Sequence, residues 1–423
     1  MNIVKVNAKS KEIERLCSRY IAPSEEIHKK VLHILADIQK NGAKAAIRYA
    51  KEFDGLKGNS LKISQNGIDA AAKKVPESLK QALRLSIRNV WQFHQKQMEK
   101  SWFLPSKDNV KLGQRIRPMR RVGLYVPGGA GVYPSTVIMN AVPALVAGVS
   151  EIVVVTPAKN GLNPAVAFVL KELGITEVYH IGGAQAIGLL AYGDKKIERV
   201  DKIVGPGNVF AAVAKKEVFG IVDIDMIAGP SEVLVLADDS ADPDFVAADL
   251  LAQAEHGSGF EAAICITDSM DFAKDVSTCI DLQVENSPKK ELLEKTLEHF
   301  GRILVVPSLE EGIVIANKIA PEHLEVMTQN AEDVSEKLFN AGAIFIGPWS
   351  SEPVGDYFAG PNHVLPTNGT ARFSSPLGVY DYLKRTSIIR YSQKAILKNG
   401  KAIAEIAETE GFYHHAQAIL KRL

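Results

Sequence analysis

Cysteine is scarce in this chain of 423 residues, which has three cysteines at the widely separated positions 17, 265 and 279. This spacing is typical neither of a disulfide framework nor of a zinc site built from thiolates. The first residues also lack the apolar core of a signal peptide. These absences favour a reducing compartment, and we expect a cytoplasmic protein.

An excess of charge of one sign is missing as well. Lys and Arg number 50 and Asp and Glu number 49, which gives a net charge of +1. Such a balance gives no electrostatic footprint for nucleic acid or an anionic membrane. No uncharged apolar run reaches the length of about 18 residues that a membrane-spanning helix needs. We therefore expect neither nucleic acid nor a membrane as a partner.

The standard dinucleotide fingerprint is also absent, because the sequence contains neither Gly-x-Gly-x-x-Gly nor a phosphate-binding P-loop. Glycine-rich turns instead occur at 125–129, 182–185 and 205–208, each between a predicted strand and a predicted helix. Ligands of open α/β sheets bind at such strand ends, where helix N-termini offer free N–H groups. Glycine also permits tight turns without any ligand, so both interpretations stay open.

Short apolar runs alternate with helical patterns from residue 122 onward. The predicted strands are 152–155, 177–181 and 202–204 in a first series and 233–236, 262–267, 303–306, 324–327 and 343–346 in a second. Helical patterns at 164–173, 184–191 and 209–218 separate the strands of the first series. This order predicts parallel sheets with right-handed crossovers. We therefore expect an α/β fold with two doubly wound, incomplete Rossmann-type domains.

The two ends of the chain have another character. Residues 1–20 are short and charged, and they predict a helical N-terminal arm that packs on another surface. The segments 24–52 and 66–100 have the apolar spacing of amphipathic helices. From about residue 375 the chain is basic and then helical at 402–407. This last part is too short to hold its own core, so we expect a C-terminal tail that docks elsewhere.

Gln253 and His256 end an apolar helical run and lie three residues apart. Side chains at that spacing share a helix face, so both would reach one metal ion. Oxygen and nitrogen ligands without thiolate suit zinc or another borderline divalent metal. A cationic histidine at the negative end of the helix dipole is the plainer alternative.

Glu322 and His323 are adjacent and lie just before a predicted strand. Only a turn would let both side chains face one site. Histidine titrates near neutrality and suits proton transfer, and glutamate is a second base that would activate water. A surface turn with two charges is the alternative interpretation.

Asp356 and His363 occur in a glycine-rich loop, and Glu410 and His415 occur in the tail. Asp356 would complete a mixed oxygen and nitrogen metal shell, although aspartate also favours turns for its own reasons. Histidine is rare in this chain, with ten in all, and several lie in or beside these motifs. The histidines therefore group with the candidate sites.

Taken together, these motifs resemble those of the histidinol dehydrogenase family. The matching segments are 122–129, 224–232, 251–256, 320–325, 360–367 and 371–384. The resemblance runs from about residue 25 to the C-terminus, and the motifs follow in the family's order. It implies a homodimer in which each tail crosses to the partner subunit.

The resemblance also implies a role for each candidate residue. It implies a zinc site with the ligands Gln253, His256 and Asp356 from one subunit and His415 from the partner's tail. His415 is favoured over His414 because of its spacing from Glu410-Gly411. It implies Glu322 and His323 as the catalytic acid/base pair. The implied NAD contacts are Tyr125, Gln185 and Asn208 on the three glycine-rich turns. The implied substrate contacts are Ser231, Gln253, His256, His323, Asp356, His363, Glu410 and His415.

The implied reaction is the zinc-dependent, four-electron oxidation of L-histidinol through L-histidinal to L-histidine with two NAD⁺, the last steps of histidine biosynthesis. The implied domains are an arm over 1–20, a discontinuous zinc, substrate and catalytic domain over 21–121 and 233–374, an NAD-binding domain over 122–232 and the tail over 375–423. Two alternatives stay open. One is a related zinc- and NAD-dependent dehydrogenase of another amino alcohol or a sulfonated diol, and the other is a zinc hydrolase. A non-catalytic binding protein is the least favoured.

Overall fold

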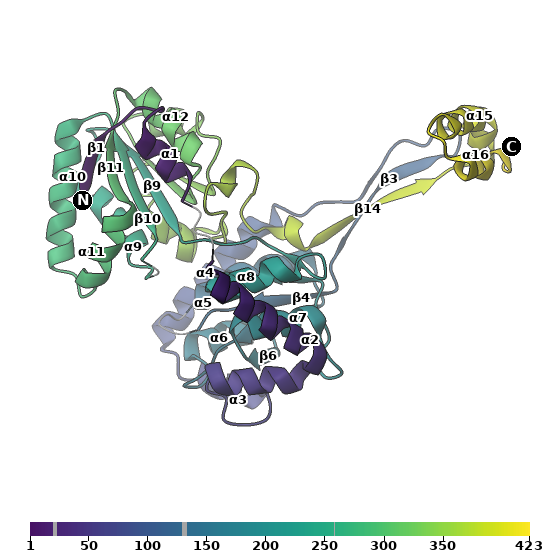
Figure 1. Ribbon diagram of the computed structural model, residues 1–423, viewed down its shortest axis with the longest axis horizontal. Coiled ribbons are helices and arrows are strands. Elements are labelled where there is room, and N and C mark those ends of the chain that lie inside the picture. The colour runs from purple at the N-terminus through teal and green to yellow at the C-terminus, as the bar shows by residue number, and fades with distance from the viewer. Residues whose placement is uncertain (20–22, 129–132, 258) are drawn as a thin grey trace.

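Two parallel sheets and an extended arm make up the computed structural model, which describes residues 1–19, 23–128, 133–257 and 259–423 (Figure 1). Every strand of the two sheets runs parallel to its neighbours. Helices cover both faces of each sheet, which confirms the predicted α/β class with two doubly wound parts.

The smaller sheet has the strand order β6-β5-β4-β7-β8. Its strands are β4 (Arg121–Tyr125), β5 (Glu151–Thr156), β6 (Glu177–His180), β7 (Lys202–Val204) and β8 (Asp223–Ile224). One face packs on α3 (Gln65–Ala72), α4 (Glu77–Gln95), α5 (Pro134–Ala147) and α6 (Pro164–Glu172), and the other on α2 (Glu25–Phe53), α7 (Gly183–Tyr192) and α8 (Val209–Val218). The strand order reverses between β4 and β7, which is where open α/β sheets bind ligands.

The larger sheet has the strand order β1-β11-β10-β9-β12-β13. Its strands are β1 (Asn2–Lys5), β9 (Glu232–Ala237), β10 (Ala262–Thr267), β11 (Gly301–Val305), β12 (His323–Met327) and β13 (Ala343–Ile346). One face packs on α9 (Pro243–Ala254), α10 (Met270–Glu285) and α11 (Lys290–Phe300), and the other on α1 (Lys11–Cys17), α12 (Leu309–Ile319) and α13 (Ala331–Ser335). The buried strands β9 and β10 explain the unbroken apolar runs in the sequence.

The N-terminal third differs from the sequence prediction in three places. Residues 1–20 do not form a separate helical arm, because β1 is an edge strand of the larger sheet and α1 packs on α12. The helix predicted over 66–100 is two helices, because Pro76 has no N–H to continue the first one. Helices α2 and α3 contact the helices of the smaller sheet, whereas the predicted boundaries group 21–121 with the larger one. The domain boundaries themselves stay a prediction.

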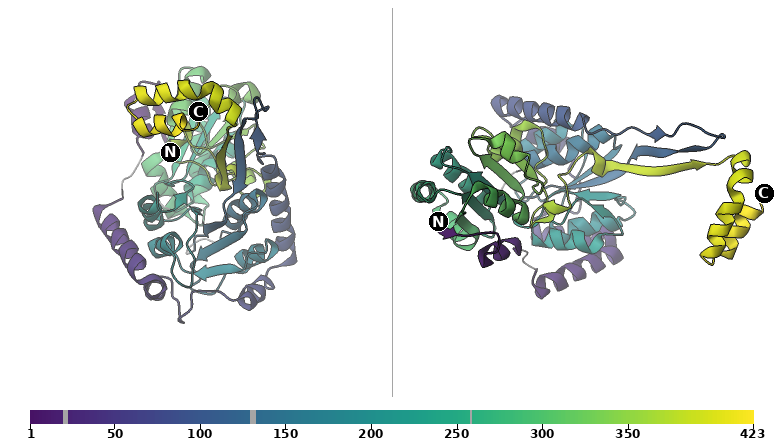
Figure 2. Two further views of the ribbon diagram at one scale, coloured as in Figure 1. Left: turned by 90° about the vertical axis from the view of Figure 1, so that its right-hand side faces the viewer. Right: turned by 90° about the horizontal axis from the view of Figure 1, so that it is seen from above.

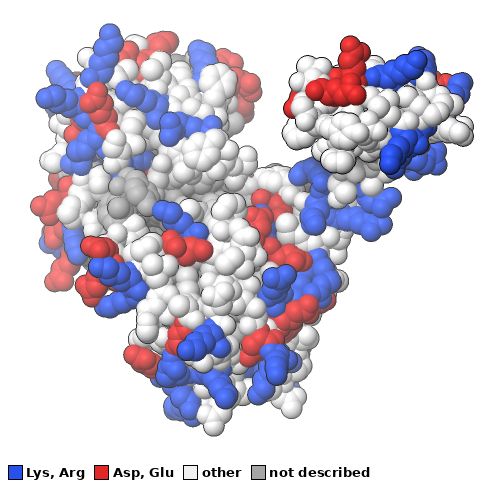
Figure 3. Space-filling model, turned by 45° about the vertical axis from the view of Figure 1, so that its right-hand side comes forward, with Lys and Arg blue, Asp and Glu red and all other residues white. Residues whose placement is uncertain are grey.

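An arm that the sequence did not predict projects from the body. Strands β3 (Lys111–Pro118) and β14 (Leu383–Arg390) pair antiparallel, and β2 (Trp102–Phe103) pairs with β3. At the far end, α15 (Gln393–Thr409) packs on α16 (Tyr413–Leu420), well away from both sheets (Figures 1 and 2). Lys and Arg side chains lie along the arm and on its helices (Figure 3). Within the described residues, no helix combines the length and the apolar character that crossing a membrane requires.

Candidate active site

One cavity of about 1170 Å³ opens at the carboxyl ends of β4 and β5, and its lining includes residues from each of the three glycine-rich turns. Tyr125, Gln185 and Asn208 all border it. The Tyr125 hydroxyl accepts a hydrogen bond from the Gly183 N–H at 3.0 Å. Asn208 Oδ1 caps α8 by accepting from the N–H of Phe210 at 3.1 Å. The structure therefore brings the three predicted cofactor contacts together.

Asp54, which follows α2, also borders this cavity. Its Oδ2 accepts from the Gly182 N–H at 3.0 Å and from Gln185 Nε2 at 3.2 Å, so it orients the Gln185 amide. Burial raises the pKa of this carboxyl group, against the two hydrogen bonds that lower it. Sequence reasoning missed Asp54, which carries no local motif. Gly129, the last residue of the first turn, lies outside the described residues.

Glycine is required at Gly205, where the turn after β7 passes close to β4. Its φ is +111°, and an added Cβ would lie 2.2 Å from the Tyr125 carbonyl oxygen. An L side chain would meet both backbone strain and this clash. The glycine thus allows the two strand ends to meet at the cavity.

His323 begins β12, and its imidazole is buried against the neighbouring strand β9. Its Nδ1 donates to the Glu232 carbonyl oxygen at 3.1 Å, which leaves the lone pair on Nε2. Nε2 is buried, lacks a hydrogen-bond partner within the described part of the chain and lies 3.6 Å from Asp356 Oδ1. Nε2 is therefore the ring nitrogen at which the second proton is gained or lost.

Glu322 precedes His323 and contacts the same strand. Its Oε2 accepts from the Glu232 N–H at 2.9 Å and lies 3.8 Å from His323 Nδ1. Both residues are buried, at 6 % and 2 % exposed. The backbone of Glu232 thus holds the two predicted acid/base residues side by side, and the surface-turn interpretation is wrong.

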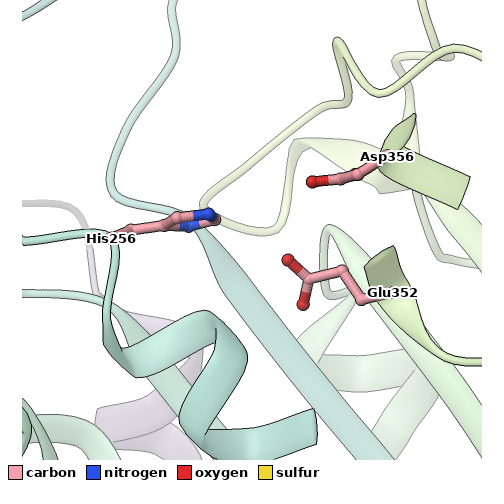
Figure 4. A group of neighbouring side chains, drawn as sticks. All are labelled: His256, Glu352 and Asp356. Atoms are coloured by element: carbon pink, nitrogen blue, oxygen red, sulfur yellow. The ribbon is translucent and has the colours of Figure 1, made fainter. Parts of the chain in front are cut away.

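Ligand atoms of His256, Glu352 and Asp356 lie within 4.8 Å of one another. Figure 4 shows these side chains pointing toward one another, with His256 after the end of α9 and the carboxylates on the opposite segment. Glu352 begins α14 (Glu352–Val354), and Asp356 lies in the helical turn η1 (Gly355–Ala359). Hydrogen bonds from α4 hold η1, because Ser86 Oγ donates to the Tyr357 carbonyl oxygen at 2.6 Å.

Gln253 lies beside this cluster, and its amide is 2.6 Å from His256 Nδ1. The two residues do not share a helix face as predicted, because α9 ends at Ala254. A turn closed by the His256 N–H and the Gln253 carbonyl oxygen, at 3.3 Å, brings them together instead. The predicted pairing is therefore present, through a different local structure.

Two further predicted substrate contacts border these groups. His363 Nδ1 donates to the Asp356 carbonyl oxygen at 3.1 Å. Ser231 directly precedes the Glu232 backbone that holds Glu322 and His323. The structure thus places both beside the predicted acid/base pair or the cluster.

The tail residues Glu410 and His415 lie elsewhere. They border a hollow of about 630 Å³ on α15 and α16, at the far end of the arm. Figures 1 and 2 show these helices far from the larger sheet. Within one chain, the structure does not bring Glu410 and His415 to the cluster.

The electrostatics of the cluster are dominated by buried acids. Burial raises the pKa of Glu322 to about 8 and that of Glu352 to about 7. Burial alone would lower the pKa of His323, but Glu352, Glu322 and Asp356 together hold it well above its ordinary value. Burial would raise the pKa of Asp356, yet His323 and His363 keep it below its usual range.

Sequence reasoning missed Glu352. It lies four residues before Asp356, at the start of a short helical segment, and this spacing of two carboxylates was the available signal. One such pair is common in any sequence, so only the folded structure singles it out. Glu352 is 2 % exposed, which is rare for an isolated carboxylate.

Comparisons with known proteins identify the family and the fold. A family model described as histidinol dehydrogenase matches residues 18–423. Histidinol dehydrogenase from Bacillus subtilis is 49 % identical over 403 residues, covering 95 % of this chain and 94 % of that protein. The protein of the same name from Carboxydothermus hydrogenoformans is 47 % identical over 409 residues, covering 96 % of each. The crystal structure of histidinol dehydrogenase from Elizabethkingia anophelis superposes with a TM-score of 0.94 at 36 % identity, covering 100 % of this chain and 98 % of that one.

Proposed function

The chain belongs to the histidinol dehydrogenase family, and from this we propose that it oxidises L-histidinol through L-histidinal to L-histidine, with zinc and NAD as cofactors. The observation that carries the proposal is the buried, unpaired Nε2 of His323, 3.6 Å from Asp356 in the acidic cluster. The proposal includes the place of this reaction at the end of histidine biosynthesis.

The residues present fit both cofactors. His256, Asp356 and the Gln253 amide offer nitrogen and oxygen ligands to a borderline divalent ion, and buried acids supply compensating negative charge. The cavity at the ends of β4 and β5 has the size and strand-end location of a dinucleotide site, and Tyr125, Gln185 and Asn208 border it. When bound, zinc would orient the substrate through its nitrogen atoms, and NAD would take up the hydrides.

His323 supplies the base in the first oxidation. A primary alcohol is far too weak an acid to ionise at neutral pH, so hydride leaves carbon readily only as the hydroxyl group loses its proton. Nε2 accepts that proton, while Nδ1 stays bonded to the Glu232 carbonyl oxygen and fixes the ring. General-base catalysis of this kind contributes about 10²–10⁴-fold.

Glu322 serves the second oxidation. Burial raises the pKa of Glu322 to about 8, so its ionised form, which takes a proton from water, gains population as the pH rises above neutrality. Water then adds to the aldehyde while His323 returns the proton of the first oxidation to the carbonyl oxygen. The hydrate that forms has a hydroxyl group whose proton His323 accepts in turn. The hydrate gives up the second hydride and becomes the carboxylic acid.

The proposal also includes a homodimer with exchanged tails. Exposed apolar side chains on α15 and α16 and between them, among them Ile406, Phe412 and Tyr413, form a surface that no other part of the described chain covers. His415 would complete the metal shell, and Glu410 the substrate contacts, of the other subunit. The tail over 375–423 is accordingly proposed as the docking unit.

The proposed function is tested by adding L-histidinol and NAD⁺ to the purified protein and recording NADH and histidine. We expect two NADH for each histidinol consumed. A zinc hydrolase would move no hydride and give no NADH signal. NADH from another amino alcohol or a diol, but not from histidinol, would instead support the related dehydrogenase.

We expect Glu322→Gln to slow the oxidation of histidinal more than that of histidinol, by about 10²–10⁴-fold in the histidinal step. The amide cannot take a proton from water, but it keeps an oxygen that accepts from the Glu232 N–H. NADH formation from each substrate, measured separately, checks this. Equal losses in both half-reactions would argue against Glu322 as the base for water.

A further inference from the structure

The amide of Gln253 is held at both ends within the candidate metal site. It is fully buried, and its hydrogen bonds are satisfied when the nitrogen faces Glu352 Oε2 and the Glu232 carbonyl oxygen, at 3.2 Å each. The oxygen then faces His256 Nδ1 at 2.6 Å. The reverse orientation would turn the oxygen toward acceptors. The neighbours therefore decide which end of the amide faces the site.

We propose that Glu352 is a positioning residue that holds the Gln253 amide with its oxygen toward the metal and so sets the affinity of the site. This inference rests on the zinc site of the proposed function. An amide binds a cation through its carbonyl oxygen, whereas its NH₂ group has only donors to offer. A carboxylate that accepts from the NH₂ group also draws negative charge onto the oxygen, which makes the oxygen a better ligand.

The position of Glu352 is itself fixed by a contact with β12. Its backbone N–H donates at 2.7 Å to Oε1 of Glu325, a fully buried residue in the middle of β12. Asp249, one helical turn before Gln253 on α9, adjoins Glu325, and burial raises the pKa of both carboxyl groups. Helix α14 also packs directly on α9. These contacts keep the Glu352 carboxylate and the Gln253 amide at hydrogen-bonding distance.

The alternative is that Glu352 is itself a metal ligand, since its carboxylate lies within 4.8 Å of ligand atoms of His256 and Asp356. Its Oε2 is already engaged by the Gln253 nitrogen. Glu352 also faces His323, whose pKa it raises. A carboxylate shared between an amide N–H and an imidazole is typical of a group that orients ligands.

The test uses the full-length protein stripped of metal with a chelator and titrated with Co²⁺, whose visible absorption reports the ligand set. Competition with a coloured chelator gives the affinity for Co²⁺ and for Zn²⁺. We expect Glu352→Ala to weaken both affinities by about 10–100-fold. Glu352→Gln should lose less, because its amide oxygen still accepts from Gln253. The absorption spectrum at saturation should keep its shape in both variants.

A reciprocal exchange gives the sharpest readout. In Gln253→Glu/Glu352→Gln, the new carboxylate ligates through one oxygen and accepts from the new amide through the other, with the total charge unchanged. We expect the double variant to bind Co²⁺ more tightly than Gln253→Glu alone, so the two changes are not additive. Glu255→Gln is the matched control, since it removes a carboxylate beside His256 that pairs with Lys289 at 3.0 Å instead of with Gln253.

Three results would overturn the inference. The first is an unchanged metal affinity in Glu352→Ala, and the second is a strictly additive loss of affinity in the double variant. The third is a loss of spectral intensity in Glu352→Gln equal to that in Asp356→Asn, because that result would make Glu352 a ligand. Circular dichroism of the metal-free variants shows whether each is folded. A wild-type protein that binds neither ion would refute the zinc site and the inference together, whereas normal wild-type binding with an unaffected Glu352→Ala would refute the inference alone.

Discussion

His323→Asn is expected to lower kcat for both half-reactions by about 10²–10⁴-fold. Each hydride transfer needs a hydroxyl proton to leave, and the proposed base is Nε2 of His323, which is buried and faces Asp356. Asparagine preserves much of the size and still offers an N–H to the Glu232 carbonyl oxygen. The loss should therefore fall on kcat more than on KM. Steady-state NADH formation from histidinol and from histidinal measures both parameters.

His28→Asn is a suitable control for this variant, because His28 is a partly exposed residue on α2 whose Nε2 lies 3.9 Å from Glu217 Oε1. It should leave both half-reactions unchanged. If His323→Asn retained wild-type kcat with either substrate, the assignment of the base would be wrong for that half-reaction. A rise in KM alone would make His323 a substrate contact and nothing more.

The parts of the fold that the sequence predicted best are those buried on both faces. Strand β10 occupies Ala262–Thr267, as predicted, because six consecutive buried residues leave an unbroken apolar run. Strands β3 and β14 have exposed or partly exposed residues at every position except Leu383, and they therefore show no apolar run. Their pairing depends on a partner nearly 300 positions away, between Lys111 and Arg390 at one end, which no local pattern encodes.

The candidate site was predictable to the extent that its residues form local pairs. Gln253 with His256, and Glu322 with His323, were found as neighbours in sequence, and both pairs meet in the structure. Glu352 was missed because its significance comes from the Gln253 amide, about 100 positions away, which only tertiary packing brings near. The roles of these residues in catalysis and metal binding stay predictions.

His415→Asn is expected to lower activity by more than about 100-fold. Loss of a residue that only supports a metal ligand costs about 10–100-fold, and loss of a ligand itself should cost more. Its own chain keeps His415 on α16, and this helix lies at the end of the arm, far from α9 (Figure 1). His256 follows the end of α9. If the tail serves the neighbouring subunit, the lost ligand is one that another chain supplies. Zinc content and NADH formation of the purified variant measure the loss.

Mixed dimers separate an exchanged tail from a tail that folds back on its own chain. A dimer with His323→Asn in one subunit and His415→Asn in the other has one site with an intact body and an intact tail, but only if tails are exchanged. Co-expression with two different affinity tags and sequential purification yields this dimer, and we expect about half of wild-type activity because one of its two sites is complete. The control dimer has His323→Asn in one subunit and Glu322→Gln in the other, so the body of each subunit carries a change. Neither of its sites is complete, and we expect it to be inactive even when tails are exchanged. Recovery in neither dimer would mean that each tail serves its own chain, since no arrangement of unexchanged tails can unite the intact His323 with the intact His415.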